Sequence, residues 1–375
     1  MRHFTIFILL LGCCCCNQHR QVSPLKSYQV ETAIDMESKT VWLDSISDSI
    51  SIIPLETSDN ITIGQFKDAK LHKNLLFVSH NTPGQPFKLS VFGLNGKYLW
   101  DIGSMGHGPG EYNSVWDYFF NNDKVYIHDY MRFAVLCYTL DGKFIKKISY
   151  SPHLGNIANI TFLDKDIIVG SLSLFQGNET RIVFLNENGI LLDSIKFEPH
   201  NVQYASGGGT HFFKYSGNQY FSENWDDTVF FIRKDLKVFP KYILNKGIYT
   251  VNFKDFVEYG EKYRNAKKVL AFFENDKFIL LQGGSFGYHG YICIDKELDE
   301  VNKVRFFYNQ ETCRSFRKVV EYANNPFLKN PVLVDDGSPT FGIAGFSTDN
   351  TIWIGAEKPL NEEDNPIIIL IHLKK

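Results

Sequence analysis

The chain has 375 residues, 44% of them hydrophobic and 15% aromatic, which is ample material for a large core and favours strands over helices. The formal net charge is only -3 and no long block of like charge occurs, so the electrostatic footprint of nucleic-acid binding is missing. We therefore expect a strand-rich protein that has no nucleic-acid partner.

Residues 1–16 have the pattern of a bacterial export signal. Arg2 gives a basic start, and the apolar run from Phe4 to Leu11 is too short to span a bilayer. The segment LLGC, which ends at Cys13, resembles the lipobox of bacterial lipoproteins, in which the cysteine is acylated and becomes the new amino terminus. An ordinary signal peptide with a coincidental cysteine run is the alternative.

The lipobox resemblance implies a protein that sits on a membrane without crossing it, because two or more acyl chains anchor a protein stably. We expect this membrane to belong to a bacterial cell envelope, with the outer membrane favoured. The polar residues 17–27 are expected to form a tether between the anchor and the folded domain.

Three cysteines lie outside the processing region: Cys137, Cys293 and Cys313. Their number is odd, their separations are wide, and no C-x-x-C motif occurs. The sequence therefore predicts no disulfide framework and no cysteine metal site.

Short strand-like segments recur along the rest of the chain and alternate with tight polar turns. Residues 117–150 show the repeating unit most plainly: four strands, with turns at residues 121–123 and at Asp141-Gly142. The turn glycines Gly96, Gly142 and Gly189 lie roughly 45 residues apart, which is the spacing of a propeller blade. Counting the later, more divergent units predicts six blades.

The last unit, residues 341–375, supplies only three clear strands. We expect the segment from Val41 to Pro54 to supply the fourth, so that the two ends of the chain close the ring and leave only short edges. The sequence thus predicts an all-β fold, a six-bladed β-propeller over residues 28–375 with four-stranded antiparallel blades. Short helical insertions are expected on one face, at residues 249–268 and 309–340.

The glycine-rich stretch IGSMGHGPGEYNSVWDYFF, residues 102–120, raises the question of a phosphate-binding loop. Such a loop needs a helix directly after it, whose amino-terminal N–H groups meet the anion. Residues 114–120 favour a strand instead, so we interpret the stretch as the junction between two blades, where glycines permit close backbone approach.

Three segments, GHGPGEY, NWDDTVFFI and EEDNPIIILIHLKK, together resemble the six-bladed, NHL-like β-propeller lipoproteins of bacterial envelopes. The resemblance covers nearly the whole mature chain, and much of that family has no assigned activity. It implies that the glycine-rich junction leads from an outer strand to the innermost strand of the next blade. The glycine-rich motif occurs clearly only once, a departure from pure NHL repeats.

In such a propeller the longer loops and the blade junctions share one face, and the tight turns share the other. We expect binding on the long-loop face, because loops on a rigid scaffold commonly carry function. Seven histidines map to that face: His80, His107, His128, His153, His200, His211 and His289. Three converging imidazoles could hold a metal, but no H-x-H or H-x-x-x-H pair occurs, so we expect hydrogen-bonded histidines and no metal or cofactor.

Other polar and aromatic residues of that face suit contacts to a sugar or a peptide, and packing within the fold is the alternative role. The candidate ligand-binding residues are His107, Glu111, Tyr112, Arg132, Tyr204, His211, Trp225, Tyr288 and His289.

No Ser-His-Asp order, nucleophile elbow or paired-carboxylate motif occurs, so no catalytic residue is predicted. The favoured hypothesis is a lipid-anchored binding module whose partner is a carbohydrate, a peptide or an envelope protein. One alternative is a metal-dependent NHL-type lyase or lactonase-like hydrolase with its site at the channel mouth. An architectural subunit of an envelope complex is a third hypothesis.

Overall fold

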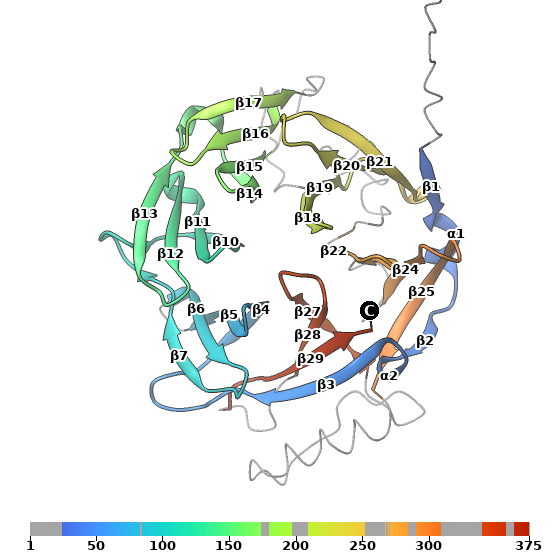
Figure 1. Cartoon of the computed structure of the whole chain (residues 1–375), viewed down its shortest axis with the longest axis horizontal. Coiled ribbons are helices and arrows are strands. Elements are labelled where there is room, and N and C mark those ends of the chain that lie inside the picture. Colours follow the sequence, from blue (N-terminus) through green and yellow to red (C-terminus); the bar gives the residue numbers. More distant parts are fainter. Residues whose placement is uncertain are drawn as a thin grey trace, which may run out of the picture.

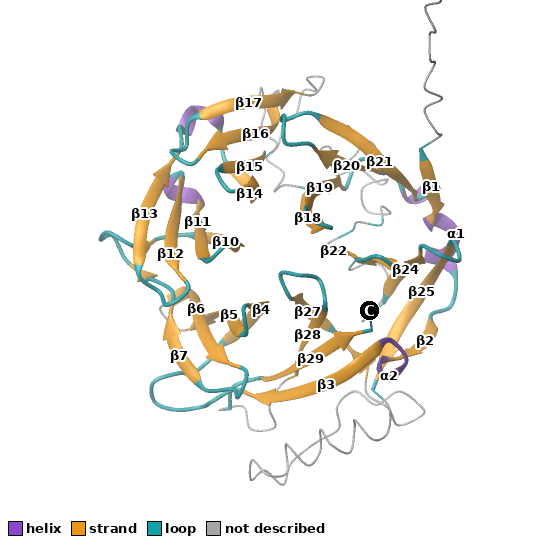
Figure 2. Ribbon diagram, in the orientation of Figure 1, coloured by secondary structure: helices purple, strands orange, loops and turns teal. Residues whose placement is uncertain are grey.

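The structure is a computed structural model of the chain, and it describes residues 25–82, 85–173, 180–196, 209–251, 267, 269, 271–283, 290–308, 340–357 and 364–374. Six sheets of these residues form a closed ring (Figure 1). Strands and loops make up nearly all of it, with a few short helices at the periphery (Figure 2). The predicted all-β, six-bladed propeller is confirmed.

The first three blades follow one another along the chain, each beginning with its innermost strand. Blade 1 comprises β4 (Gln65–His72), β5 (Leu75–Thr82), β6 (Gln85–Gly93) and β7 (Tyr98–Asp101). Blade 2 comprises β10 (Val115–Asn121), β11 (Lys124–Asp129), β12 (Ala134–Thr139) and β13 (Phe144–Ser149). Blade 3 comprises β14 (Ile157–Asp164), β15 (Ile167–Leu172), β16 (Thr180–Asn186) and β17 (Leu191–Lys196). Neighbouring strands of these blades are antiparallel, as predicted.

The other three blades use the same four-stranded plan. Blade 4 comprises β18 (Thr210–Tyr215), β19 (Asn218–Glu223), β20 (Thr228–Ile232) and β21 (Val238–Asn245). Blade 5 comprises β22 (Ala271–Glu274), β23 (Phe278–Gln282), β24 (Tyr291–Asp295) and β25 (Glu300–Phe307), with β26 (Thr340–Phe341) paired to β25. Blade 6 comprises β27 (Ile343–Phe346), β28 (Ile352–Glu357), β29 (Ile367–Leu373) and β3 (Ser47–Pro54).

The ring closes where β3 pairs antiparallel with β29, with Pro54 opposite Ile367 and Ile50 opposite Ile371. The prediction that an early segment completes the last blade is therefore confirmed. Its boundary needs correction, because Val41 and Trp42 belong to β2 (Lys39–Trp42), which pairs in parallel with β25 of blade 5. The short helix α2 (Leu43–Ile46) separates β2 from β3 and carries the chain from one blade to the next.

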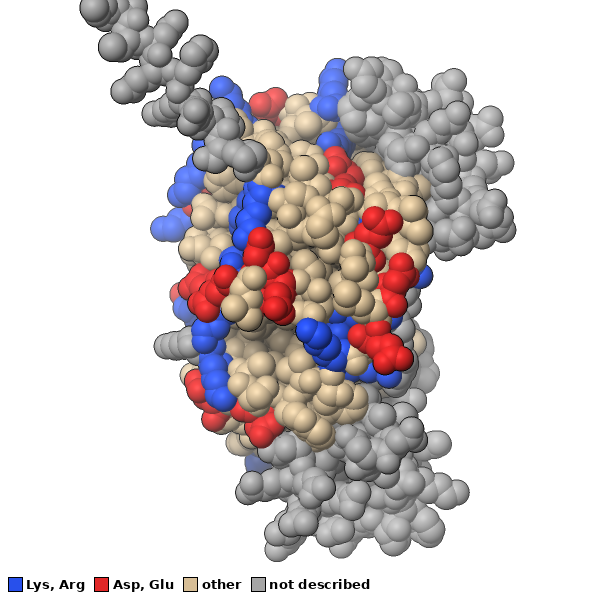
Figure 3. Space-filling view, turned by 90° about the vertical axis from the view of Figure 1, so that its right-hand side faces the viewer, with Lys and Arg blue, Asp and Glu red and all other residues tan. Residues whose placement is uncertain are grey.

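The chain before β2 also runs along the outside of the ring. Strand β1 (Lys26–Gln29) pairs in parallel with β21 of blade 4, and α1 (Val30–Asp35) buries Val30, Ala33 and Ile34. Blades 4 and 5 each gain a fifth strand, which covers an outer edge that would otherwise expose unpaired backbone groups. The predicted tether of residues 17–27 therefore overlaps the folded ring, which includes Lys26 and Ser27. Figure 3 shows this side of the ring, where lysines and arginines lie interspersed with acidic residues.

The regularly spaced turn glycines lie where each blade contacts the one before it. All three have a positive φ, 77° at Gly96, 82° at Gly142 and 79° at Gly189. A Cβ at Gly189 would lie 2.0 Å from the carbonyl oxygen of Ser149, the last residue of blade 2. A Cβ at Gly96 would lie equally close, 2.0 Å, to the carbonyl oxygen of Pro54. Strand β3 thus occupies the place that the outer strand of a preceding blade occupies elsewhere in the ring.

Apolar side chains fill six separate clusters, one at each interface between neighbouring blades. The interface of blades 6 and 1 contains Ile53, Leu71 and Ile368, which are 5%, 6% and 0% exposed. This cluster brings together the two ends of the chain. Cys137 and Cys293 are free thiols, and Cys313 and the predicted helical insertions lie outside the described residues, apart from a few positions at their ends.

Candidate functional site

The glycine-rich stretch joins the outermost strand of blade 1 to the innermost strand of blade 2. Two short strands within it, β8 (Ser104–Met105) and β9 (Glu111–Tyr112), pair in parallel, and β10 follows directly. No helix begins after the glycines in this described segment, so the geometry that a phosphate loop needs is not formed. The interpretation of the stretch as a blade junction is confirmed.

The loop formed by these glycines encloses a carboxylate of its own chain. The N–H of Gly108 donates to Oε2 of Glu111 at 2.7 Å, and a Cβ at Gly106 would lie 2.1 Å from the same oxygen. A side chain at position 106 would therefore require this carboxylate to move. The Glu111 carboxylate therefore already occupies the place in the loop that an external anion would need.

Arg132 ties the junction together from the 3-10 helix η1 (Tyr130–Arg132). Its guanidinium donates to the carbonyl oxygens of Glu111 at 2.8 Å and Gly106 at 2.6 Å. It also lies 2.9 Å from Nδ1 of His107 and 3.6 Å from the buried carboxylate of Asp129. These contacts occupy the guanidinium with groups of the protein itself.

Four of the candidate residues from the sequence thus lie together at the junction: His107, Glu111, Tyr112 and Arg132. Tyr112 is only 2% exposed and packs in the cluster between blades 1 and 2. The described contacts of this group hold the loop in shape.

The remaining candidates are dispersed. His211 lies on β18 with its Nε2 3.3 Å from the Asn224 side-chain amide, and Trp225 lies in the turn that follows β19. Tyr204, Tyr288, His289 and the predicted lipidation site Cys13 lie outside the described residues.

Two of the predicted loop-face histidines, His80 and His128, are fully buried inside the blades, and His211 is half-buried. His80 lies 3.0 Å from the Ser90 hydroxyl and His128 lies 2.9 Å from the Tyr150 hydroxyl. Burial lowers the pKa of each of His80, His128 and His211 to about 4, because charging an imidazole away from water is unfavourable. These three imidazoles are therefore neutral at pH 7.

Within the described ranges, no group of three or more His, Cys, Asp or Glu side chains is arranged to hold a metal ion. His200 and His289 lie outside those ranges. The metal-dependent alternative therefore stays a hypothesis.

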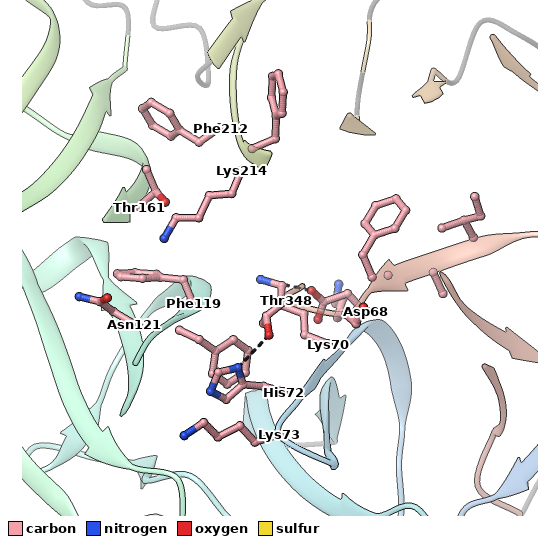
Figure 4. Close-up of a pocket in the computed structure, with 18 of the residues that line it drawn as sticks. Asp68, Lys70, His72, Lys73, Phe119, Asn121, Thr161, Phe212, Lys214 and Thr348 are labelled. Carbon is pink, nitrogen blue, oxygen red and sulfur yellow. Dashed lines mark hydrogen bonds and ion pairs between the residues drawn. The ribbon is translucent and has the colours of Figure 1, made fainter. Parts of the chain in front are cut away.

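A cavity of about 1130 Å³ lies at the centre of the ring and forms a central channel. Its wall is formed largely by the innermost strands β4, β10, β14, β18 and β27, and it reaches the end of the ring where the tight turns lie (Figure 4). Its charged residues are Lys67, Lys70, Lys73 and Lys214, with Asp68 and Asp123. The long-loop face was the predicted place for a site, and reasoning from the sequence missed this polar channel wall.

Lys70 is held by carboxylates of two blades. Its Nζ lies 3.0 Å from Oδ1 of Asp117 on β10 and 3.7 Å from Oδ2 of Asp68 on β4, and it donates to the carbonyl oxygen of Tyr118 at 2.6 Å. Burial lowers the pKa of Lys70, but the charges of Asp117 and Asp68 outweigh this and leave the pKa raised. Lys70 is therefore a compensated cation.

Lys214 is different, because no hydrogen bond or ion pair of its ammonium group occurs among the described residues. Its side chain extends from β18 into the channel beside Thr161 and Phe119 (Figure 4). The surrounding protein lowers the pKa of the amine by burial, and the charge of Asp164 only partly opposes this. Asp164 itself pairs with Lys234 at 3.0 Å. Among the described residues, Lys214 and Lys67 are therefore the channel lysines without an ion pair, and Lys70 and Lys73 are paired.

His72 is fixed as a neutral imidazole at the same end of the channel. Its Nε2 lies 2.9 Å from the carbonyl oxygen of Asn122, which can only accept, so Nε2 carries the proton. Nδ1 then accepts from the Thr348 hydroxyl at 2.8 Å. The ring stacks on Phe120 with centroids 4.6 Å apart, and burial lowers its pKa.

The family model described as "Domain of unknown function (DUF4934)" matches residues 25–372. The chain belongs to the DUF4934 family. The match includes the strap, which consists of the two strands β1 and β2 along the outside of the ring, as well as all six blades. No curated protein matches this DUF4934 chain.

Solved structures share the fold of the DUF4934 propeller at low sequence identity. A Bacteroides fragilis NCTC 9343 protein inferred to be exported superposes with a TM-score of 0.62 and 16% identity, covering 94% of this chain and 99% of that one. A DUF4221 family member from Bacteroides vulgatus ATCC 8482 has a TM-score of 0.52 and 8% identity, covering 88% and 97% of the two chains. Virginiamycin B lyase from Staphylococcus aureus has a TM-score of 0.47 and 10% identity, covering 87% and 99%, a likeness too weak to bear on activity.

In the part of the chain that the structure describes, none of the helices has the length and apolar character needed to span a membrane.

The buried histidines predict how stability depends on pH. Their folded pKa values lie below the value of about 6.5 expected in the unfolded chain, so the unfolded chain binds more protons between these values. The free energy of unfolding should therefore fall as the pH is lowered from about 6.5 to about 4. Over this pH range, the free energy of unfolding of His128→Gln should fall by on the order of 2 kcal/mol less than that of the wild type. Urea denaturation across the pH series measures the difference.

The exposed His153, in the 3-10 helix η2 (Pro152–Leu154), provides the matched control. His153→Gln should leave the pH dependence as in the wild type. If His128→Gln and His153→Gln show the same dependence of unfolding free energy on pH, the conclusion that His128 is buried and neutral is wrong.

Proposed function

We propose that this protein is an exported, lipid-anchored binding module that holds a negatively charged ligand in the central channel of its propeller. The observation that carries the proposal is Lys214, whose ammonium group extends into a cavity of about 1130 Å³ and has no close counter-charge among the described residues. No catalytic step is part of the proposal.

The balance of charge in the channel favours an anion. Four lysines and two aspartates line the cavity. His72 adds no charge at pH 7, because burial lowers its pKa below the usual histidine value of about 6.5. A bound anion would give Lys214 a partner that the described residues do not supply, and a charge-assisted hydrogen bond is stronger than a neutral one.

The rest of the wall suits a ligand with an apolar portion. Phe119 and Phe212 line the cavity near Lys214, and Thr161 and Gln282 offer polar groups from other blades. Pockets of this kind hold a ligand mainly through apolar contacts and use a few polar groups to orient it. The favoured ligand is therefore a small organic anion with an aromatic or aliphatic part.

Export and anchoring are supported by the amino-terminal sequence. The lipobox-like segment ends at Cys13, and a structural neighbour from Bacteroides fragilis is itself inferred to be exported. We propose that lipid on Cys13 holds the propeller on a membrane of the cell envelope, with the outer membrane favoured.

Anilinonaphthalene sulfonate is a suitable probe for the channel, because it combines aromatic rings with a permanent negative charge. Lys214→Met should weaken its binding about tenfold, since one charge-assisted hydrogen bond is lost, and Lys214→Arg should retain most of it. In the wild type the affinity should also fall at alkaline pH, as Lys214 loses its proton below the usual lysine pKa. Fluorescence titration measures both effects.

Lys196, exposed on the outermost strand of blade 3, is the matched control, and Lys196→Met should bind the probe like the wild type. Uncharged phenylnaphthylamine, which lacks the sulfonate, should bind the wild type and Lys214→Met equally. Equal affinity of wild type and Lys214→Met for the sulfonate would contradict the proposal.

Cys13→Ala should abolish lipidation, because the thiol is the acylated group. The protein expressed in its own cells should then lose incorporation of an alkyne-tagged fatty acid and leave the membrane fraction, measured by in-gel fluorescence and fractionation. Cys16→Ala, within the same cysteine run, is the matched control and should stay labelled and membrane-bound. Labelling that persists in Cys13→Ala would refute the anchor at this position.

A further inference from the structure

A second, smaller cavity of about 290 Å³ lies between blades 1 and 2, next to the channel. Lys67 and Asp68 line both cavities, and Trp116 and Phe87 line only the smaller one. None of the contacts proposed for the anion in the channel involves this space.

A β-bulge places Trp116 at this cavity. On β10, Val115 lies opposite Asp129 and Asp117 lies opposite His128, so Trp116 is the extra residue between two paired positions. Bulges re-aim side chains and are common beside binding sites. The Trp116 side chain is 54% exposed, which is unusual for a large aromatic residue on an innermost strand.

The exposed indole is nevertheless held in a defined orientation. Tyr130 meets it edge to face, with ring centroids 5.6 Å apart. Strand β4 has a matching bulge, where Phe66 lies opposite His80 and Asp68 lies opposite Ser79, leaving Lys67 as the extra residue. The two bulged strands therefore direct an aromatic ring and an ammonium group toward one cavity.

Two carboxylates supply hydrogen-bond acceptors beside the indole. Asp117 Oδ1 accepts from Lys70 Nζ at 3.0 Å and from the N–H of Tyr118 at 2.7 Å. Asp68 Oδ1 accepts from the Ser79 hydroxyl, and its Oδ2 lies 3.7 Å from Lys70 Nζ. A carboxylate has about four lone-pair sites, so acceptor capacity remains on both groups.

The charges near the cavity balance, because Lys67 and Lys70 accompany Asp68 and Asp117. An organic cation would meet two ammonium groups, and an anion would meet two carboxylates. A neutral ring with many hydroxyl groups satisfies all of these neighbours. Its hydroxyls can donate to the carboxylates and accept from Lys67, while its C–H face lies against the indole.

We propose that this cavity is a subsite for a neutral sugar ring that packs on Trp116 and hydrogen-bonds to Asp68 and Asp117. The subsite is separate from the proposed anion site at Lys214, and neither depends on the other.

The test uses the folded, purified mature protein and a panel of neutral sugars: glucose, galactose, mannose, N-acetylglucosamine and their disaccharides. At least one sugar should bind saturably, measured by isothermal titration calorimetry, and should shield Trp116 from quenching by acrylamide. Trp116→Ala should weaken that binding about tenfold, through the loss of the aromatic face. Asp117→Asn should weaken it less, because an amide keeps one acceptor oxygen.

Trp42, on the strap strand β2 and 38% exposed, is the matched control, and Trp42→Ala should leave the sugar affinity unchanged. Lys214→Met should also bind the sugar normally, which separates this proposal from the anion site. The proposal is overturned if no sugar of the panel binds, if binding survives Trp116→Ala, or if only tetramethylammonium shows binding that depends on Trp116.

Discussion

The antiparallel ladder between β3 and β29 is the constraint on which the rest of the molecule depends. It joins an early segment of the chain to the last strand through seven opposed pairs of residues, with a register shift between His372 and Leu373. The interface of blades 6 and 1 forms only when this ladder does, because its apolar cluster draws on both ends of the chain. Burial of such side chains contributes roughly 1.5–3 kcal/mol each. Closure also fixes the diameter of the ring, and with it the spacing between the innermost strands that line the channel.

The wall of that channel differs around the ring. Blades 1 to 4 direct lysines, carboxylates and polar groups inward, whereas blade 6 contributes mainly small and aromatic residues such as Ala344 and Phe346. Charges therefore concentrate on one side, where Lys70 couples blades 1 and 2 through Asp68 and Asp117. The closed ring holds Lys214 across the channel from Lys70, with no ion partner among the described residues. Lys214 is exposed within the channel, so its ammonium group is available to a bound anion, and we interpret it as a feature of binding.

Much of the fold could be predicted because its signals are local. Gly96, Gly142 and Gly189 mark turns that need a positive φ, and the same glycines let each blade touch the one before it. The parallel strap strands β1 and β2 were not predicted, because four-residue strands with exposed side chains carry no clear alternation. The boundary at Val41 was wrong for the same reason.

The site was harder to predict. Arg132, Glu111 and His107 are candidate binding residues in the sequence, and the structure shows that they contact backbone groups of the junction and one another, which spacing alone does not reveal. The channel lysines were overlooked because a charged residue on a strand normally indicates a face in open solvent. Only the ring places Lys70 and Lys214, from blades far apart in the sequence, around one cavity.

The most direct test of the closed ring is a cross-link across its seam. Ser49 and His372 are directly opposite one another on β3 and β29, within the range of Cα separations that a disulfide spans. Ser49→Cys combined with His372→Cys should form an intramolecular disulfide under mild oxidation, identified by mass spectrometry, and should raise the unfolding midpoint above that of the reduced form. Failure of the two thiols to pair in the folded protein, while each single variant folds normally, would contradict the closure and the channel that depends on it.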